Sequence, residues 1–155
     1  MIAKHDWVWF ILRIAVAWMY LFPVPGLVAD WDATTLLTRL VSGIFVNFLS
    51  VLGIFLMVLG AISILFGIYA QIGGIFLFVY TLIGIRVHFR LAQVIASREL
   101  PDICRAQGGP ALGDVKSLGV LGQITSGQKN VVLAAVALAF VILGSGSISL
   151  TANLW

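Results

Sequence analysis

The densest group of side chains that could do chemistry is Arg86, His88 and Arg90. On a helix, residues 86 and 90 share a face, whereas residue 88 points nearly to the opposite side. Two guanidinium groups at this spacing could bind a phosphate or another anion, or pair with Asp30 and Asp32, and His88 could protonate a quinone. The same residues could instead anchor a helix end to lipid headgroups, so both interpretations stay open.

Arg13 is the other candidate for binding, because it lies inside a long apolar stretch that begins at Trp7. A charged side chain in hydrocarbon costs about 3 kcal/mol or more, so it needs a partner or a route to water. Arg13 could extend to the headgroups or pair with Asp6. It could alternatively donate hydrogen bonds to an anion or to a quinone carbonyl inside the bundle.

The sequence contains no motif that would make the chain an enzyme by itself. There is no nucleophile elbow, phosphate loop or metal-binding helix motif, and the single cysteine and two histidines form no metal-ligand set. We therefore predict no catalytic residue, no metal and no required cofactor, although a quinone or a lipid could be bound.

The amino-acid composition indicates whether water or lipid surrounds the helices that carry these residues. The chain has 155 residues, of which 61% are apolar and 10% charged, and its mean hydropathy is +1.12. Soluble domains are about half apolar and a quarter charged, so too few polar groups remain here to cover a surface in water. The net charge of +3 comes without a dense basic face, which argues against nucleic acid and for the bilayer as the partner.

Four stretches are long and apolar enough to cross a bilayer as helices, which takes about 20 residues. They are residues 7–28, 48–69, 72–91 and 131–150. We therefore predict an all-α polytopic membrane protein, a four-transmembrane-helix bundle in which residues 1–155 form one membrane domain.

Two segments outside these spans are more polar. Residues 30–47 fit a helix lying in the interface after the first span, although part of a fifth span stays open. Residues 92–129 are predicted to be a polar loop, within which apolar residues recur about every three positions and indicate a short surface helix.

A stripe of glycines follows the second span at Gly53, Gly60 and Gly67. The spacing of seven is nearly two helical turns, so the three lie on one face. Small residues let helix backbones approach closely in lipid, which predicts a packing seam. Room for a ligand tail is the alternative.

Basic residues are distributed unequally between the two sides of this topology, and they mark the cytoplasmic side of membrane proteins. The side with residues 92–129 collects Arg39, Arg86, Arg90, Arg98, Arg105, Lys116 and Lys129, whereas the terminal side has Lys4 and, near it, Arg13. We predict that both termini lie outside and that the 92–129 loop is cytoplasmic.

The C-terminal run NVVLAAVALAFVILGSGSISLTANL (residues 130–154) resembles the last helix of the DoxX family, with its Gly-x-Gly break at 144–146 and its Ser-Leu pair at 149–150. The runs ILRIAVAWMYLF (11–22) and VLGAISILFG (58–67) are similar to the family's first and second helices. The resemblance implies a small four-helix protein of the prokaryotic inner membrane.

From this resemblance we expect a non-catalytic membrane subunit that serves as an accessory or scaffolding component of a larger membrane complex. The alternative is a membrane subunit of a quinone-linked oxidoreductase of the thiosulfate–quinone type. In that case its site would be at Arg86, His88 and Arg90.

Overall fold

The computed structural model describes residues 4–99, 102–151 and 154. Within these residues the chain forms six α-helices, which are α1 (Lys4–Leu21), α2 (Val24–Ala29), α3 (Trp31–Arg39), α4 (Val46–Phe66), α5 (Ala70–Ser97) and α6 (Asp102–Leu143). Four helical segments are long and apolar enough to cross a membrane: residues 6–29, α4, α5 and residues 111–143 of α6. The predicted all-α bundle with four spans is confirmed.

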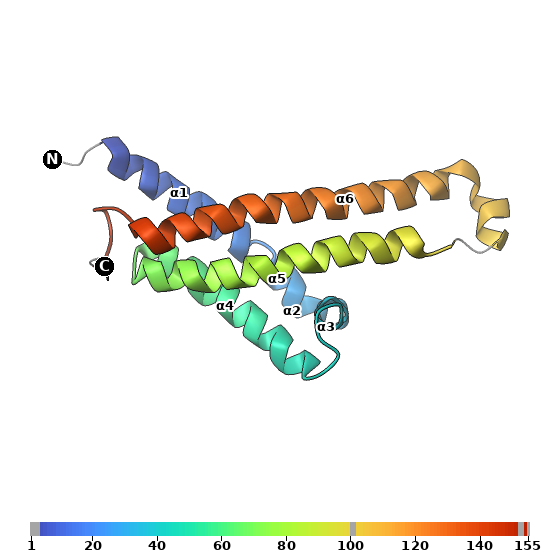
Figure 1. The fold of residues 1–155 in the computed structure, drawn as a ribbon, viewed down its shortest axis with the longest axis horizontal. Coiled ribbons are helices and arrows are strands. Elements are labelled where there is room, and N and C mark those ends of the chain that lie inside the picture. The colour runs from blue at the N-terminus through green and yellow to red at the C-terminus, as the bar shows by residue number, and fades with distance from the viewer. Residues whose placement is uncertain (1–3, 100–101, 152–153, 155) are drawn as a thin grey trace.

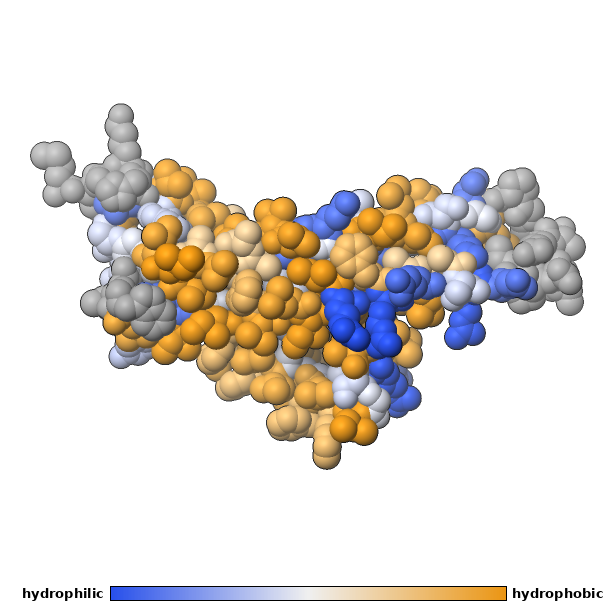
Figure 2. All heavy atoms as spheres, in the orientation of Figure 1, coloured by the Kyte–Doolittle hydropathy of each residue, from blue (hydrophilic) through white to orange (hydrophobic). Residues whose placement is uncertain are grey.

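The long axis of the molecule is the antiparallel pair of α5 and α6 (Figure 1). Near the chain termini α4 packs against α5, and α1 packs against α4. The core of this bundle joins all four spans through buried side chains, among them Tyr20, Met57, Ile64, Leu77 and Phe140. Figure 2 shows apolar side chains over most of the bundle, whereas hydrophilic ones gather near α3 and along the half of the α5–α6 pair that lies away from the chain termini. An apolar surface around a packed core is what a bilayer requires.

The first span bends where α1 gives way to α2, at Pro23 and Pro25. Proline has no backbone N–H, so an α-helix kinks where it occurs in the interior. The chain nevertheless continues in nearly helical form, because the Phe22 amide donates to the carbonyl of Trp18 and the Leu27 amide to that of Pro23. The bend directs the end of the span toward α3.

The polar segment after the first span contains the short helix α3. Its N-terminus is capped by Asp30, whose carboxylate accepts a hydrogen bond from the Ala33 amide at 3.0 Å. Nine residues rise only about 14 Å, less than half of the hydrocarbon core, so the alternative of a fifth span is wrong. An amphipathic helix of this length fits the interfacial segment that the sequence predicts.

The prediction of a loop over residues 92–129 is wrong. From residue 92 to residue 97 this segment is helical as the last part of α5, and from residue 102 to residue 129 it is helical as the first part of α6. The reason is packing between the two helices, which small residues allow: a Cβ added at Gly127 would lie 3.1 Å from the Phe89 ring, and one at Gly119 would lie 3.8 Å from Ile95. Polar composition alone does not disclose such pairing.

The fourth span also ends earlier than predicted, at Leu143 rather than at residue 150. Gly144 and Gly146 adopt φ angles of 71° and 79°, a left-handed conformation that favours glycine and stops the helix. The chain then turns back over the α4–α5 connection, where the amide of Thr151 donates to the carbonyl of Gly67 at 3.2 Å. The hydroxyl of Thr151 in turn accepts from the amide of Tyr69 at 2.8 Å.

Candidate functional site

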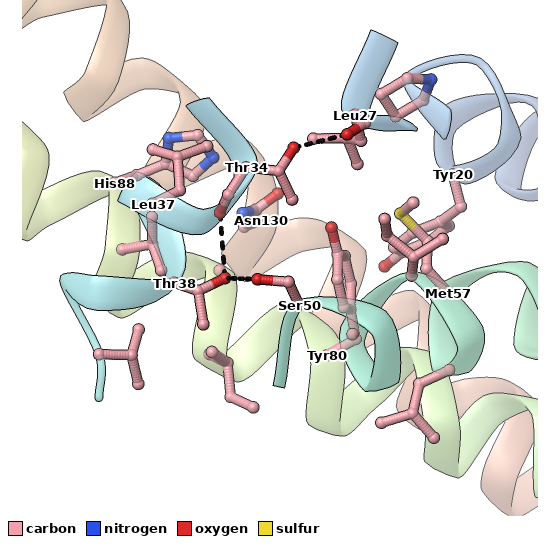
Figure 3. A pocket seen from close by; sticks show the side chains of 18 of the residues that line it. Tyr20, Leu27, Thr34, Leu37, Thr38, Ser50, Met57, Tyr80, His88 and Asn130 are labelled. Carbon is pink, nitrogen blue, oxygen red and sulfur yellow. Dashed lines mark hydrogen bonds between the residues drawn. The ribbon is translucent and has the colours of Figure 1, made fainter. Parts of the chain in front are cut away.

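A cavity of about 460 Å³ lies near the α3 end of the bundle and is lined by residues of all six helices (Figure 3). Most of the lining is apolar. The polar side chains that face it are Tyr20, Thr34, Thr38, Ser50, Tyr80, His88, Lys129 and Asn130. Small-molecule sites have this size and character, mainly apolar walls with a few placed polar groups.

One wall of the cavity is held in place by hydroxyl groups of α3 and α4. The Thr34 hydroxyl donates to the carbonyl of Leu27 at 2.7 Å. The hydroxyls of Thr38 and Ser50 lie 2.7 Å apart and join the two helices, and each also lies within hydrogen-bond distance of a carbonyl of its own helix. These groups are satisfied by the protein, so their main effect is to position the wall.

At the deep end of the cavity, Tyr20 of α1 is bonded to Thr81 of α5 through their hydroxyl oxygens at 2.5 Å. The Thr81 hydroxyl lies 2.5 Å from the carbonyl of Leu77 and donates to it, so Tyr20 must be the donor to Thr81. The proton of Tyr20 is thereby used in fixing the first span to the third.

Tyr80 and Asn130 differ from these residues, because neither side chain forms a hydrogen bond with any residue that the structure describes. The Tyr80 ring stands edge-on to that of Tyr20, with centroids 6.2 Å apart. The Asn130 amide lies against Gly84, where an added Cβ would be 2.8 Å from its nitrogen. Both therefore present hydrogen-bonding capacity to the cavity.

His88 lines the same cavity and is half-buried. Its Nδ1 is 2.7 Å from the amide oxygen of Gln123, which orients the ring and favours the tautomer protonated at Nδ1. The exposed Lys129 is also part of the lining and brings a positive charge to the cavity.

Arg86 and Arg90, which the sequence groups with His88, do not line the cavity. Both are exposed, and Arg90 donates a hydrogen bond to the carbonyl of Leu40, just beyond α3. No ion pair joins either arginine to Asp30 or Asp32. The structure thus separates His88 from the two arginines, as their positions on α5 require.

Arg13 lies at the other end of the bundle and is only 3% exposed. Its guanidinium donates to three backbone carbonyls, those of Leu65 (3.0 and 3.3 Å), Ser145 (3.3 Å) and Ile148. These carbonyls belong to the last turn of α4 and to the segment after α6. The side chain therefore turns inward rather than toward headgroups, and it ties three parts of the chain together.

The three glycines of the predicted stripe occupy three different environments. Gly60 is buried against α5, where an added Cβ would lie 2.8 Å from Leu77 and 2.9 Å from the carbonyl of Gly73. Gly67 lies beyond the end of α4 as its left-handed C-cap, with φ at 65°. Gly53 lines the cavity, and a Cβ there would meet only Tyr80, at 3.8 Å.

Sequence reasoning missed Tyr80 and Asn130. The available signal was a polar side chain inside or at the start of an apolar span, the same criterion that selected Arg13. Among the residues that the structure describes, no group of three His, Cys, Asp or Glu side chains could hold a metal ion. The arrangement offers hydrogen bonding and shape, with no nucleophile beside a general base.

No family model, curated protein or solved structure matches this chain. The resemblance to the DoxX family stays a prediction.

Proposed function

We propose that the protein is a non-catalytic integral membrane subunit that serves as an accessory or scaffolding component of a larger membrane complex, as the DoxX resemblance implies. The observation that carries this proposal is the length of the α5–α6 hairpin. From residue 111 to residue 143 the 33 residues of α6 rise about 50 Å, well beyond the ~30 Å hydrocarbon core of a bilayer, so one end of this segment extends out of the hydrocarbon. The pair extends past α3 and beyond the other helices (Figure 1).

The projecting part of the hairpin has an apolar row on α6, formed by Val115, Leu118 and Leu121. These side chains are 65%, 65% and 56% exposed. Outside the hydrocarbon, an exposed apolar row costs free energy unless another protein covers it. A partner subunit is therefore the occupant that we expect for this row.

The charge distribution supports a cytoplasmic position for the hairpin with the termini outside, and the DoxX resemblance implies the prokaryotic inner membrane. Arg86 and Arg90 lie in the second half of α5 and Lys129 lies in α6, whereas Arg98 follows the end of α5 and Lys116 bonds to it from α6. The Lys116 ammonium group donates to the carbonyl of Arg98 at 2.7 Å, which holds the two helices together near their connection. Clustered basic residues on one side favour cytoplasmic placement.

The test is complex formation by Leu118→Asn, which places an amide in the apolar row. The tagged protein is purified in mild detergent from its own host, and the size of its complex is measured on native gels. We expect the complex to lose its partner subunits while the variant keeps its helix content in circular dichroism.

Ser117→Asn is the matched control, because Ser117 is exposed on the same turn but is outside the apolar row. It should assemble as the native chain does. A native chain that runs as a monomer, or complexes of equal size for both variants, would contradict the proposal.

The rival function, a membrane subunit of a quinone-linked oxidoreductase, is favoured by a different observation: His88 lines a largely apolar cavity open to a lipophilic molecule. In this proposal His88 would exchange protons with the bound quinone, and the electrons would come from a partner subunit. Replacing His88 with Gln should then abolish quinone reduction by the purified complex and leave its composition unchanged.

A further inference from the structure

The cavity holds two polar side chains that the fold does not use. Thr34, Thr38, Ser50 and Tyr20 are all bonded within the protein, whereas Tyr80 and Asn130 form no side-chain hydrogen bond with the described residues. Both residues are half-buried, and within a bilayer a polar group that has no partner costs about 1–3 kcal/mol. Two of them facing one cavity indicate a ligand that completes their bonding.

The rest of the lining defines the shape of that ligand. Beyond Tyr80 the walls are formed by apolar side chains of the first span and α4, including Met19, Leu52, Leu56 and Met57. At the other end the lining carries His88, Lys129 and the α3 hydroxyls. The cavity is thus polar toward the α3 end and apolar toward the middle of the bundle, an amphipathic form that suits a molecule drawn from the bilayer.

The charges of the cavity lining limit which head group the ligand can have. Among the lining residues Lys129 carries the one permanently charged side chain, and no carboxylate is present to pair a cation. An ion deep in the cavity would lose its hydration without a counter-charge, so the head of the ligand should be neutral there. Tyr80 and Asn130 can both donate, which favours an oxygen acceptor that has no proton of its own.

We propose that this cavity binds a neutral amphipathic molecule from the bilayer whose carbonyl group accepts hydrogen bonds from the Tyr80 hydroxyl and the Asn130 amide, with its apolar tail along the first span and α4. Two abundant membrane components have this chemistry, the quinone head and the acyl ester of a glycerolipid. The site rests on the cavity alone, so it stands or falls independently of the docking of the hairpin and of any redox reaction.

Gly53 and Gly84 are part of this site because each leaves room that a side chain would remove. Gly84 lets the Asn130 amide lie against α5, and Gly53 leaves the face of α4 beside the Tyr80 ring open to the cavity. A leucine at position 53 should enter the cavity without meeting the backbone, so it blocks binding while the fold is kept.

The experiment is native mass spectrometry of the purified protein released from nanodiscs. Nanodiscs of dioleoyl phosphatidylcholine with increasing decylubiquinone test the quinone. Nanodiscs of the ester lipid, compared with its dialkyl ether analogue that lacks the carbonyls, test the glycerolipid. We expect each chain to retain one adduct. If the adduct is decylubiquinone, its amount should saturate as the quinone is increased. If it is the lipid, it should be retained from the ester lipid and lost with the ether analogue.

The variants assign the adduct to this cavity. Tyr80→Phe and Asn130→Ala should each weaken retention about three- to tenfold, the range for loss of one hydrogen bond, and Gly53→Leu should abolish it. Tyr69→Phe is the matched control, since Tyr69 is an exposed tyrosine in the α4–α5 turn at the far end of the bundle. It should bind as the native chain does.

Tyr80→Phe removes a single oxygen, so it carries the test even if Asn130→Ala lowers the folded yield. The proposal is overturned if no adduct is retained in either kind of nanodisc. It is also overturned if Tyr80→Phe and Gly53→Leu, folded by circular dichroism, retain the adduct as Tyr69→Phe does.

Discussion

At the scale of single residues, a charge or hydroxyl inside a span has meaning only through its partners. Arg13 and His88 look alike in the sequence as candidate ligand-binding residues. Arg13 proves to be enclosed, with its fork of donors directed at carbonyls of Leu65, Ser145 and Ile148. His88 instead borders the cavity. Arg13 thus acts on the fold, where it satisfies carbonyls in the last turn of α4 and in the segment after α6.

The first prediction follows from that geometry. Arg13→Lys keeps the charge but replaces a planar fork by a single ammonium group, which cannot reach three carbonyls in the same directions. We expect the free energy of unfolding to fall by about 2–4 kcal/mol, as for loss of more than one bond to a charged group. The measurement is equilibrium unfolding in detergent micelles, followed by circular dichroism.

Arg86→Lys is the control for this prediction, because Arg86 is exposed and makes no hydrogen bond that the structure records. Its effect should stay within about 0.5 kcal/mol, as for an ordinary surface substitution. Equal stability of the two variants would show that the Arg13 contacts contribute nothing to folding.

At the scale of helices, close approach of backbones decides which elements pair. The crossing of α4 and α5 is formed by Gly60 and Gly73, each of which faces the carbonyl of the other at 2.9 Å from its would-be Cβ. Dispersion contacts between backbones are the main attraction between helices in lipid, where no hydrophobic effect drives them together. Gly74 has the same role between α5 and α6, because a Cβ added there would lie 2.9 Å from the carbonyl oxygen of Ala137.

The second prediction compares two glycines of α4. Gly60→Ala forces a methyl group to within 2.8 Å of Leu77 and 2.9 Å of a carbonyl, so the two helices must separate. We expect a loss of about 1–3 kcal/mol in unfolding free energy, the usual range for overpacking. Thermal melting in detergent, monitored by circular dichroism, measures the loss.

Gly53→Ala is the matched comparison on the same helix. The added methyl group meets only Tyr80, at an ordinary contact distance of 3.8 Å, so its melting temperature should equal or slightly exceed that of the native chain. If Gly60→Ala were as stable as Gly53→Ala, the claim that the close contact of α4 and α5 at Gly60 excludes a side chain would be wrong.

At the scale of the whole molecule, the protein has two ends with different character. The terminal end is closed by the segment after α6, which folds over the α4–α5 turn through bonds from Leu150 and Thr151 to Phe66 and Gly67. The opposite end carries α3, the cavity and the projecting hairpin (Figure 1). An even number of spans requires both termini to lie on one side of the bilayer, opposite to the hairpin.

The third prediction tests this arrangement by cysteine labelling in a Cys104→Ser background. Ser117→Cys reports on the hairpin and Ser147→Cys on the terminal end, and both positions are exposed. A membrane-impermeant maleimide should label Ser147→Cys in intact cells and Ser117→Cys only after permeabilisation. Labelling of both from the same side would refute four spans, whereas reversed labelling would refute only the orientation.

Much of the fold follows from the sequence because the bilayer imposes simple requirements of length and polarity. Stretches of about 20 apolar residues predict the four spans, and the more polar run of residues 30–47 predicts the interfacial helix that is α3. The helical pairing of residues 92–129 does not follow, since a segment with mixed polarity becomes a helix or a loop according to what packs against it. Phe89 and Gly127, which meet across the pair, are 38 positions apart (127 − 89 = 38).

The candidate site depended still more on tertiary structure. The sequence by itself determined that polar residues inside spans, such as Arg13 and His88, require an explanation, because hydrocarbon penalises every unpaired polar group. Only the packing of six helices decided that carbonyls satisfy Arg13, while Tyr80 and Asn130 face a cavity with no hydrogen-bond partner among the described residues. A hydrogen bond forms between atoms about 3 Å apart, and that proximity is set by how helices cross rather than by the order of residues along the chain.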